Sequence, residues 1–347
     1  MKKFTVSRDD SIYQAWPDLA LTPSGKLVCV FSECTHHHDR SYTRIMLCDS
    51  DDRGRNWSPK RPLTLPSQSP DPFWFWNCAR ISILRDGRLA VLVDRVSDES
   101  SSREGANSNY LFFSSDEGRT WTEPILTPAQ GIVPDKLCEL DNGRWLLSCH
   151  RKDPDFGKLV QRLWFSDDKG KTWNGPVTVG RHKGLNLCEV SIIQAGGPTL
   201  VAFHRENSGQ GWECHKSISH DYGETWGELI PFPLPGCHRP VAGFLRDGRI
   251  LITYRFSLGG KPRVGWCTQN FFAALTDKES ALAPTRDEAK ARIMPVDFDR
   301  SPEADLGYSG WVQFEDGEIY VVNYIVDDAP KAQIRGYSME MRDFLIN

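Results

Sequence analysis

A tyrosine and a glutamate are the two residues of this sequence best suited to covalent chemistry. Tyr308 stands in the stretch Asp305-Leu306-Gly307-Tyr308-Ser309, where small neighbours leave its ring open to a site. Glu189 stands among apolar residues, where an unpaired carboxylate is costly, so a partner is required. A tyrosine that is hydrogen-bonded to a glutamate can lose its proton as it attacks, which makes it a competent nucleophile. Each residue alone is an ordinary core residue, and only together do they indicate a site.

Arginines recur at one register of a repeated hairpin pattern. The residues seven or eight positions after the turn glycines are Glu33, Arg95, Arg151, Arg205, Arg255 and Tyr324. Those at the start of the same hairpins are Arg80, Lys136, Glu189, Arg239 and Tyr308. Guanidinium groups that face a common centre are costly unless an anion lies there, and their bidentate geometry suits a carboxylate. The alternative is that these arginines pair with acidic residues of neighbouring repeats.

Histidines offer a second route to catalysis. His36, His37 and His38 are consecutive on an expected loop, where they could hold a metal or act as a general acid or base near neutral pH. A solvated loop is the alternative. Two more histidines adjoin arginines of the pattern, since His204 precedes Arg205 and His238 precedes Arg239.

Two repeats supply the framework that must position these residues. The pattern S-x-D-x-G-x-x-W occurs at residues 50–57, 114–121, 166–173 and 219–226. Each copy predicts a hairpin turn in which the Asp caps backbone amides, the Gly takes positive φ and the Trp packs beneath. We expect these Asp boxes to be structural, so function must come from other residues.

The second repeat consists of an apolar run, a turn and another apolar run. It occurs around Gly25, Gly87, Gly143, Gly196-Gly197, Gly248 and Gly317. With a further strand pair after each, the sequence predicts an all-β, six-bladed β-propeller of four-stranded antiparallel blades, forming one domain over 1–347. Residues 278–300, rich in Glu, Ala and Lys, indicate an insertion in blade five. Phe4-Thr5-Val6 should pair with Gln333–Met339, closing the ring and removing exposed edges.

Composition excludes several classes of protein. The net charge of −4 argues against a nucleic-acid or membrane surface.

The ten cysteines lack metal-type spacing, so we expect buried free thiols. A disulfide between two of them is the alternative. An N-terminus without an apolar segment indicates a cytoplasmic protein, or a secreted or periplasmic one if a signal peptide has been removed. Cofactor motifs are absent, so neither a cofactor nor a metal is expected.

The four Asp boxes and six blades resemble the sialidase (neuraminidase) superfamily over essentially the whole chain. In that family a Tyr at a Tyr-Ser motif of the last blade is the nucleophile, with a Glu as its partner. Tyr308-Ser309 and Glu189 match those positions. The resemblance also implies an acid/base Asp in the loop after the first hairpin, where Asp39 falls.

The same resemblance implies three arginines that bind the substrate carboxylate. Arg205, sixteen residues after Glu189, matches one, and Arg255 or Arg263 matches the last. The family's Arg-Ile-Pro motif of blade one is replaced by Tyr13-Gln14-Ala15-Trp16-Pro17, so the first arginine is missing. Its possible substitutes are Arg80, Arg95 and Arg239.

Three functions follow from these residues. The first is a sialidase-like exo-glycoside hydrolase for an acidic sugar, with Tyr308 as nucleophile, Glu189 activating it and Asp39 as acid/base. The second is a hydrolase or lyase for uronate- or rhamnose-containing glycans that depends on a histidine, His37 or His238. The third is a non-catalytic, glycan-binding propeller. All three take a carbohydrate as ligand.

Overall fold

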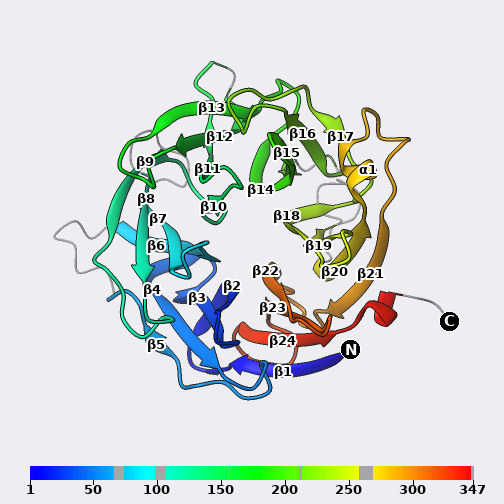
Figure 1. Cartoon of the computed structure of the whole chain (residues 1–347). Coiled ribbons are helices and arrows are strands. Elements are labelled where there is room, and N and C mark those ends of the chain that lie inside the picture. The colour runs from blue at the N-terminus through cyan, green and yellow to red at the C-terminus, as the bar shows by residue number, and fades with distance from the viewer. Residues whose placement is uncertain are drawn as a thin grey trace. The chain divides into compact units, whose positions relative to one another are not determined.

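The computed structural model describes residues 1–65, 74–97, 107–155, 157–208, 210, 213–257 and 269–344 (Figure 1). Strands dominate this part of the chain and form six antiparallel sheets of four strands each. Two compact units divide the chain, Met1–Leu137 with Asp299–Asn347, and Cys138–Phe298. Each unit contains three of the sheets, and we refer to them as unit 1 and unit 2.

Unit 1 is built around strand β2, which packs against the first strands of the other two sheets, β6 and β22. Its sheets are β2 (Tyr13–Leu21), β3 (Leu27–His36), β4 (Asp39–Ser50) and β5 (Arg61–Pro62); β6 (Trp74–Ile83), β7 (Leu89–Ser97), β8 (Ser108–Ser114) and β9 (Ile125–Gln130); and β22 (Leu306–Gln313), β23 (Ile319–Ile325), β24 (Gln333–Met339) and β1 (Lys2–Ser7). Its core is apolar and includes buried aromatic residues of β2, β22 and β23.

Unit 2 is built around strand β14, which packs against β11 and β18 (Figure 1). Its sheets are β10 (Cys138–Glu139), β11 (Trp145–Lys152), β12 (Leu159–Ser166) and β13 (Asn174–Gly180); β14 (Leu187–Gly196), β15 (Thr199–Glu206), β16 (His215–Ser219) and β17 (Ile230–Pro231); and β18 (Cys237–Phe244), β19 (Ile250–Ser257), β20 (Gln269–Thr276) and β21 (Arg292–Phe298). A 3₁₀ turn at Met341–Phe344, in unit 1, ends the described chain.

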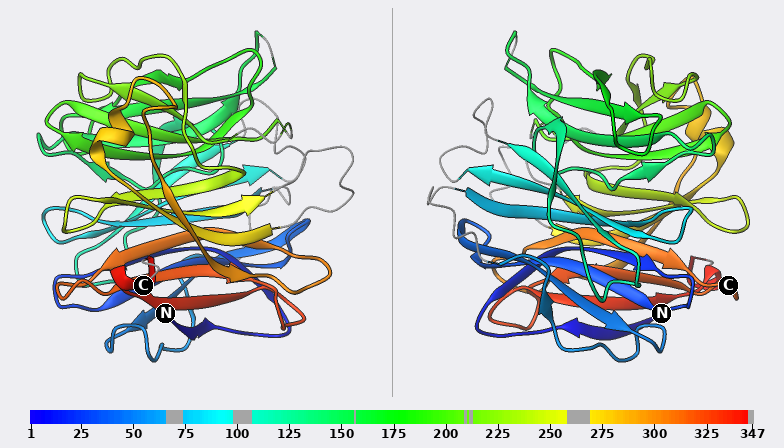
Figure 2. Two further views of the ribbon diagram at one scale, coloured as in Figure 1. Left: turned by 90° about the vertical axis from the view of Figure 1, so that its right-hand side faces the viewer. Right: turned by 60° about the vertical axis from the view of Figure 1, so that its left-hand side comes forward.

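The last sheet of unit 1 combines the two ends of the chain. Strand β1 pairs with β24 in antiparallel register, with Lys2 opposite Ser338 and Phe4 opposite Gly336. Figure 2 shows the blue first strand beside the red last strand. The predicted pairing of Phe4-Thr5-Val6 with the C-terminal strand is therefore confirmed, and it covers a backbone edge that would otherwise be open.

The Asp boxes are turns between the third and fourth strands of their sheets. In the first box the Ser50 hydroxyl accepts a hydrogen bond from the Gly54 amide at 2.8 Å, and Asp52 Oδ1 accepts one from the Asn56 amide at 2.8 Å. The Trp57 indole donates to the Gly54 carbonyl at 3.1 Å. The other three boxes repeat these bonds. Their predicted turn chemistry is confirmed.

The segment predicted as an insertion, 278–300, contains a helix and a strand. Helix α1 (Lys278–Leu282) is capped by Asp277, whose carboxylate accepts from the Ser280 amide at 2.7 Å. Strand β21 follows and pairs with β20 as the outer strand of its sheet. The segment therefore includes the edge strand of its sheet, and β21 is only partly exposed, with a buried pair near its end.

The described cysteines are free, and most of them are buried. Burial raises the pKa of Cys34 to about 11 and that of Cys48 to about 12. These thiols therefore stay protonated at neutral pH. For the nine cysteines in this part of the chain, the prediction of free thiols is confirmed, and eight of them are buried, with Cys138 the partly exposed one.

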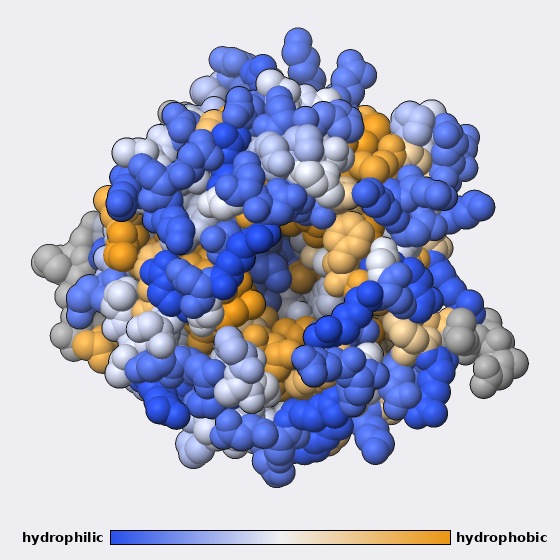
Figure 3. Space-filling model, viewed as in Figure 1, coloured by the Kyte–Doolittle hydropathy of each residue, from blue (hydrophilic) through white to orange (hydrophobic). Residues whose placement is uncertain are grey.

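Hydrophilic side chains cover most of the face drawn in Figure 3, and hydrophobic residues lie in separate patches. The large hydrophobic side chains most exposed to solvent are few and scattered over several strands and loops. Among the described residues, no helix has the length and apolar character needed to cross a membrane.

Candidate functional site

A β-bulge interrupts the first strand of five sheets at one common place. The pairing shifts lie between Ala15 and Asp18, Trp76 and Ala79, Cys188 and Ser191, His238 and Val241, and Gly307 and Ser309. Within four of these bulges the backbone is left-handed, at Trp16 (φ 55°), Glu189 (φ 51°), Arg239 (φ 51°) and Tyr308 (φ 50°). Such φ values are uncommon for residues with a Cβ and concentrate at functional sites, where a bulge re-aims a side chain.

The second strands present their residues at one register. Four of these residues lie directly opposite the one that precedes the bulge, namely Arg95, Arg205, Arg255 and Tyr324. For these four the predicted common register is confirmed. Glu33 instead pairs with Gln14, one position further from the bulge, and a shift of one residue turns a side chain to the opposite face. Accordingly, Glu33 is fully buried in ion pairs with Arg44 and Lys60.

Unit 2 gathers three arginines around Glu189. Arg205 donates to the Glu189 carboxylate at 2.6 Å and to the Asn207 side chain at 2.8 Å. Arg255 contacts Gln269 at 3.3 Å, and Arg239 is completely buried. We call Glu189, Arg205, Arg239 and Arg255 the arginine cluster.

The electrostatics of this cluster are dominated by positive charge. Burial alone would raise the pKa of Glu189, but Arg205, Arg239 and Arg255 together hold it well below its usual range. Glu189 is therefore ionised and a poor proton acceptor, which favours a role as a fixed negative charge. Three guanidinium groups act on this one carboxylate, and such a set of arginines suits an anionic ligand.

Three buried or partly buried histidines of unit 2 are held neutral. Burial, with Arg205 and Arg239, lowers the pKa of His150 to about 4, and burial with Arg205 and Arg255 lowers that of His238 to about 2. Burial also lowers the pKa of His204 to about 3, and its ring contacts the Ser217 hydroxyl at 2.9 Å. At neutral pH His238 is thus a neutral imidazole rather than an imidazolium, and its role as catalyst stays a prediction.

Tyr308 lies in unit 1, within a cluster of aromatic rings. Its side chain is buried, and its ring centre is 6.3 Å from that of Tyr324. Trp16 and Tyr13 belong to the same core cluster. Because Tyr308 and Glu189 belong to different units, the pairing of the two remains a prediction.

Beside this cluster an aspartate collects three donors. The Asp305 carboxylate accepts from Tyr13 Oη, from Tyr324 Oη at 2.8 Å and from His37 Nδ1 at 2.5 Å. We call these four residues the Asp305 network. Burial, followed by the nearby Tyr324 and Asp305, raises the pKa of Tyr13 well above its usual value, so this phenol stays protonated.

Neither Tyr13 nor Asp305 is among the site residues predicted from the sequence. Tyr13 stood in the stretch that replaces the family's first arginine motif, and Asp305 stands three residues before Tyr308. The available sign of a role for these two residues was their closeness in sequence to positions that had been predicted as part of the site. What joins them is a contact across 292 residues of sequence, which no local pattern reveals.

Arg80 has a structural role that the sequence analysis did not foresee. It is buried, donates to the Ser309 carbonyl at 3.0 Å and lies 3.3 Å from the Asp18 carboxylate. The bulge in its strand falls at Asn77 and Cys78, so Arg80 lies beyond the position that Glu189 and its equivalents occupy. Its guanidinium joins three sheets of unit 1, and the binding of substrate by Arg80 stays a prediction.

The remaining predicted residues are spread over both units. Asp39 is exposed at the first position of β4, opposite His36. The Arg95 guanidinium lies 5.5 Å and 5.7 Å from the ring centres of Trp74 and Trp76. Arg151, in β11, is half-buried and lies opposite Val160 of β12. Arg263 falls outside the described residues. In the part of the chain that is described, no group of His, Cys, Asp and Glu could hold a metal ion.

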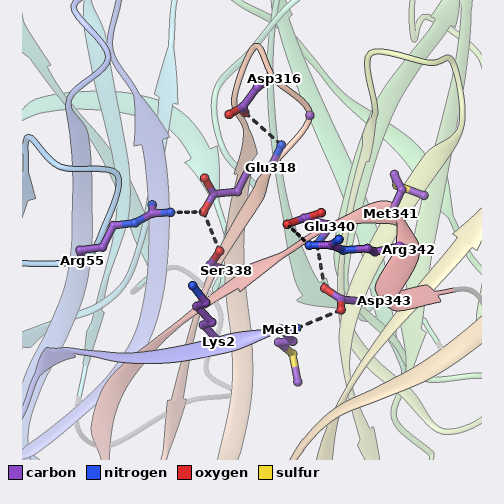
Figure 4. Close-up of a pocket in the computed structure, with 11 residues that line it drawn as sticks. Met1, Lys2, Arg55, Asp316, Glu318, Ser338, Glu340, Met341, Arg342 and Asp343 are labelled. Carbon is purple, nitrogen blue, oxygen red and sulfur yellow. Dashed lines mark hydrogen bonds and ion pairs between the residues drawn. The ribbon is translucent and has the colours of Figure 1, made fainter.

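A cavity of about 540 Å³ lies elsewhere in unit 1, where the ends of β1 and β24 meet the 3₁₀ turn (Figure 4). Several of its charged side chains pair with one another, as Figure 4 shows for Arg55 with Glu318 at 2.8 Å and for Arg342 with Glu340 at 2.8 Å. The N-terminal amino group pairs with Asp343 at 2.9 Å. This neutral pairing contrasts with the arginine cluster, and none of the candidate residues lines the cavity.

The chain is similar to several solved structures along nearly its whole length. A protein of unknown function from Dyadobacter fermentans DSM 18053 is 22% identical, with a TM-score of 0.80 over 99% of this chain and 98% of that one. The Hadza microbial sialidase Hz136 is 17% identical, with a TM-score of 0.69 over 96% and 66% of the two chains. The NanB sialidase from Streptococcus pneumoniae is 13% identical, with a TM-score of 0.67 over 98% and 70%.

These likenesses, with the six sheets, establish a sialidase-like, all-β, six-bladed propeller of four-stranded antiparallel blades, and that prediction is confirmed. At such identities they establish the fold alone. No curated protein matches the sequence. A family model described as a BNR repeat-like domain matches residues 75–321, which is more than half of the chain. The chain therefore belongs to the family of BNR repeat-like domain proteins.

Proposed function

We propose that this protein is a glycoside hydrolase that acts on an acidic sugar, and that the arginine cluster of unit 2 binds the sugar's anionic group. The observation that carries the proposal is the gathering of three guanidinium groups that lower the pKa of Glu189, with Arg205 held at 2.6 Å from its carboxylate. Burying several guanidinium groups is costly, and a carboxylate ligand would repay that cost through bidentate bonds. The ionised Glu189 keeps Arg205 oriented while the ligand is absent.

Tyr308 is the proposed nucleophile. Its left-handed bulge conformation is shared with Glu189 and Arg239, so the fold gives it the same local device that presents members of the arginine cluster. A tyrosine that attacks a sugar forms a covalent intermediate, which divides one difficult displacement into two easier ones. The likeness to proteins named as sialidases supports the choice of an acidic sugar.

The experiment that tests this proposal measures sugar release from a panel of sialosides, uronosides and rhamnosides. Wild type is compared with Arg205→Gln and Tyr308→Phe, and Arg249→Gln serves as the matched control because Arg249 forms an exposed ion pair with Asp247. We expect release from an acidic glycoside that both site variants lose and the control retains. Cleavage of neutral rhamnosides alone would contradict the proposed anion site. Absence of release across the panel would favour a binding protein.

A further inference from the structure

The Asp305 network contains a histidine whose environment fits proton transfer. His37 lies in the turn between β3 and β4, and its Nδ1 is 2.5 Å from Asp305 Oδ2. Its side chain is 34% exposed, whereas that of Asp305 is 15% exposed. The imidazole therefore reaches solvent while its carboxylate partner is mostly enclosed, as expected for a group that exchanges protons with a ligand.

The hydrogen bonds decide which ring nitrogen of His37 carries the proton. Asp305 already accepts from Tyr13 and Tyr324, so its ionised carboxylate needs a donor at the third contact. Nδ1 of His37 is that donor, which leaves Nε2 as the acceptor in the neutral ring and as a second donor in the imidazolium. Within the described residues Nε2 makes no hydrogen bond.

Packing holds the ring in this orientation. The Trp16 ring meets the His37 ring edge-on with centres 5.3 Å apart, and Tyr13 Oη lies 3.4 Å from Nδ1. Trp16 is itself the left-handed bulge residue of its sheet, and the Arg40 guanidinium stacks over it at 4.0 Å. His37 thus belongs to the same aromatic surroundings as Tyr308, which contacts Tyr324.

We infer that His37 is the acid/base of the proposed hydrolysis and that Asp305 is its positioning residue. The inference rests on the proposed function, and it replaces Asp39, which is exposed two residues further along the hairpin. As Tyr308 Oη attacks the anomeric carbon, its phenolic proton passes to solvent water. The bond from that carbon to the leaving oxygen breaks, and the protonated His37 Nε2 donates its proton to the leaving oxygen. Neutral His37 then takes a proton from a second water, whose oxygen displaces the Tyr308 oxygen, and the released phenolate regains a proton from solvent.

The test compares two kinds of substrate of the same sugar, one with an alcohol leaving group and one with 4-nitrophenol. Loss of a general acid slows cleavage of the alkyl glycoside, typically by about 100-fold to 10,000-fold. It spares the nitrophenyl glycoside, whose leaving group needs little protonation. We expect this pattern for His37→Gln, and we expect Asp39→Asn and the neighbouring control His38→Gln to retain both activities.

Two further measurements separate a catalytic role from a structural one. The alkaline limb of the pH profile for alkyl glycosides should move to lower pH in Asp305→Asn, because loss of the carboxylate destabilises the imidazolium. The titratable or charged groups of the same hairpin and of the strand beside it are Tyr13, Cys34, His36, His38, Asp39 and Arg40, and none of them is altered in that variant. Imidazole added to a folded His37→Ala variant should restore part of the lost rate.

The outcomes distinguish this inference from the proposed function. Equal activity of His37→Gln and wild type on both substrates, with an unchanged pH profile, would overturn the role of His37 and leave the hydrolase intact. A selective loss in Asp39→Asn instead would do the same. A wild type that releases no sugar from any acidic glycoside would overturn both the hydrolase and the acid/base.

Discussion

The two units of the chain handle buried charge in opposite ways. In unit 2, Glu189 is surrounded by Arg205, Arg239 and Arg255, which keep it ionised. In unit 1, Asp305 is surrounded by three hydrogen-bonding side chains, those of two tyrosines and a histidine. The same bulge geometry therefore carries an electrostatic site in one unit and a hydrogen-bonding, aromatic site in the other.

The difference suggests that one unit binds the ligand and the other carries out the reaction. Guanidinium groups keep their charge at any ordinary pH, so the arginine cluster can bind an anion but cannot exchange protons. Phenol and imidazole groups change protonation state during a reaction, and the Asp305 network keeps them beside Tyr308. The comparison predicts that variants of unit 1 reduce turnover, whereas variants of unit 2 reduce affinity and resistance to acid.

The largest effect is expected for Tyr308→Phe. Removal of a nucleophile lowers kcat by about 1,000-fold or more, because the covalent route is lost while binding is kept. The measurement is kcat with an acidic glycoside, together with binding of the free sugar by calorimetry. Tyr320→Phe is the matched control, since the Tyr320 hydroxyl bonds only structural groups of the first Asp box. If Tyr308→Phe retained its turnover, the proposed catalytic role of unit 1 would be wrong.

Arg205→Gln should mainly weaken binding. The change removes a bidentate donor and leaves Glu189 without its closest partner, and such a loss costs about 2–5 kcal/mol. We expect KM and the dissociation constant of the sugar to rise by about 100-fold, with a smaller change in kcat. If kcat decreased while KM and the dissociation constant stayed the same, Arg205 would act in the reaction itself, and the proposed difference between the two units would be wrong.

Acid should destabilise unit 2 through its neutral histidines. In the folded chain the pKa of His150 is lowered to about 4. Below about pH 6.5 the unfolded chain therefore binds a proton at this histidine, whereas the folded chain does not. Stability is therefore complete above that pH and falls as pH decreases toward 4, by up to about 1.4 kcal/mol per pH unit for each such group.

Urea unfolding at about pH 7 and about pH 5 measures this loss. His150→Gln should lose less stability than wild type between these conditions, whereas the exposed His182→Gln should lose as much as wild type. An identical loss in all three proteins would show that the acid sensitivity arises elsewhere.

The smallest effect is expected for Tyr13→Phe. It removes one of three donors to Asp305 and leaves the ring packed against Trp16, so we expect a decrease in kcat of about 10-fold or less. The Asp305 carboxylate loses one of the donors that stabilise its negative charge. It therefore becomes a stronger acceptor for His37. The alkaline limb of the pH profile should move to higher pH, opposite to Asp305→Asn. A shift in the same direction for both variants would contradict the proposed network.

Sequence alone could predict the fold because its signals are local. Each hairpin carries its own turn glycine, as at Gly25 (φ 88°), and each Asp box closes within eight residues. Equivalent positions in successive repeats then follow by counting, which correctly aligned Arg95, Arg205, Arg255 and Tyr324.

Counting failed where the backbone departs from regular pairing. The bulge at Asn77 and Cys78 has no mark in the sequence, so Arg80 was aligned with Glu189 although it lies further along its strand. Low pKa values were equally hidden, because the neutrality of His238 results from burial beside Arg205 and Arg255. The contact of His37 with Asp305 spans 268 residues and depends on the completed fold of unit 1.

The pairing of β1 with β24 has a consequence for how the chain is made. Lys2 leaves the ribosome long before its partner Ser338, which is synthesised more than three hundred residues later. Until β24 has been made, β1 must therefore remain with its backbone edge unpaired, and of the six sheets the one that it completes is the last to form. Its slow, non-local closure makes this strand the place where a nascent chain is most exposed to wrong partners and where a chaperone would help most.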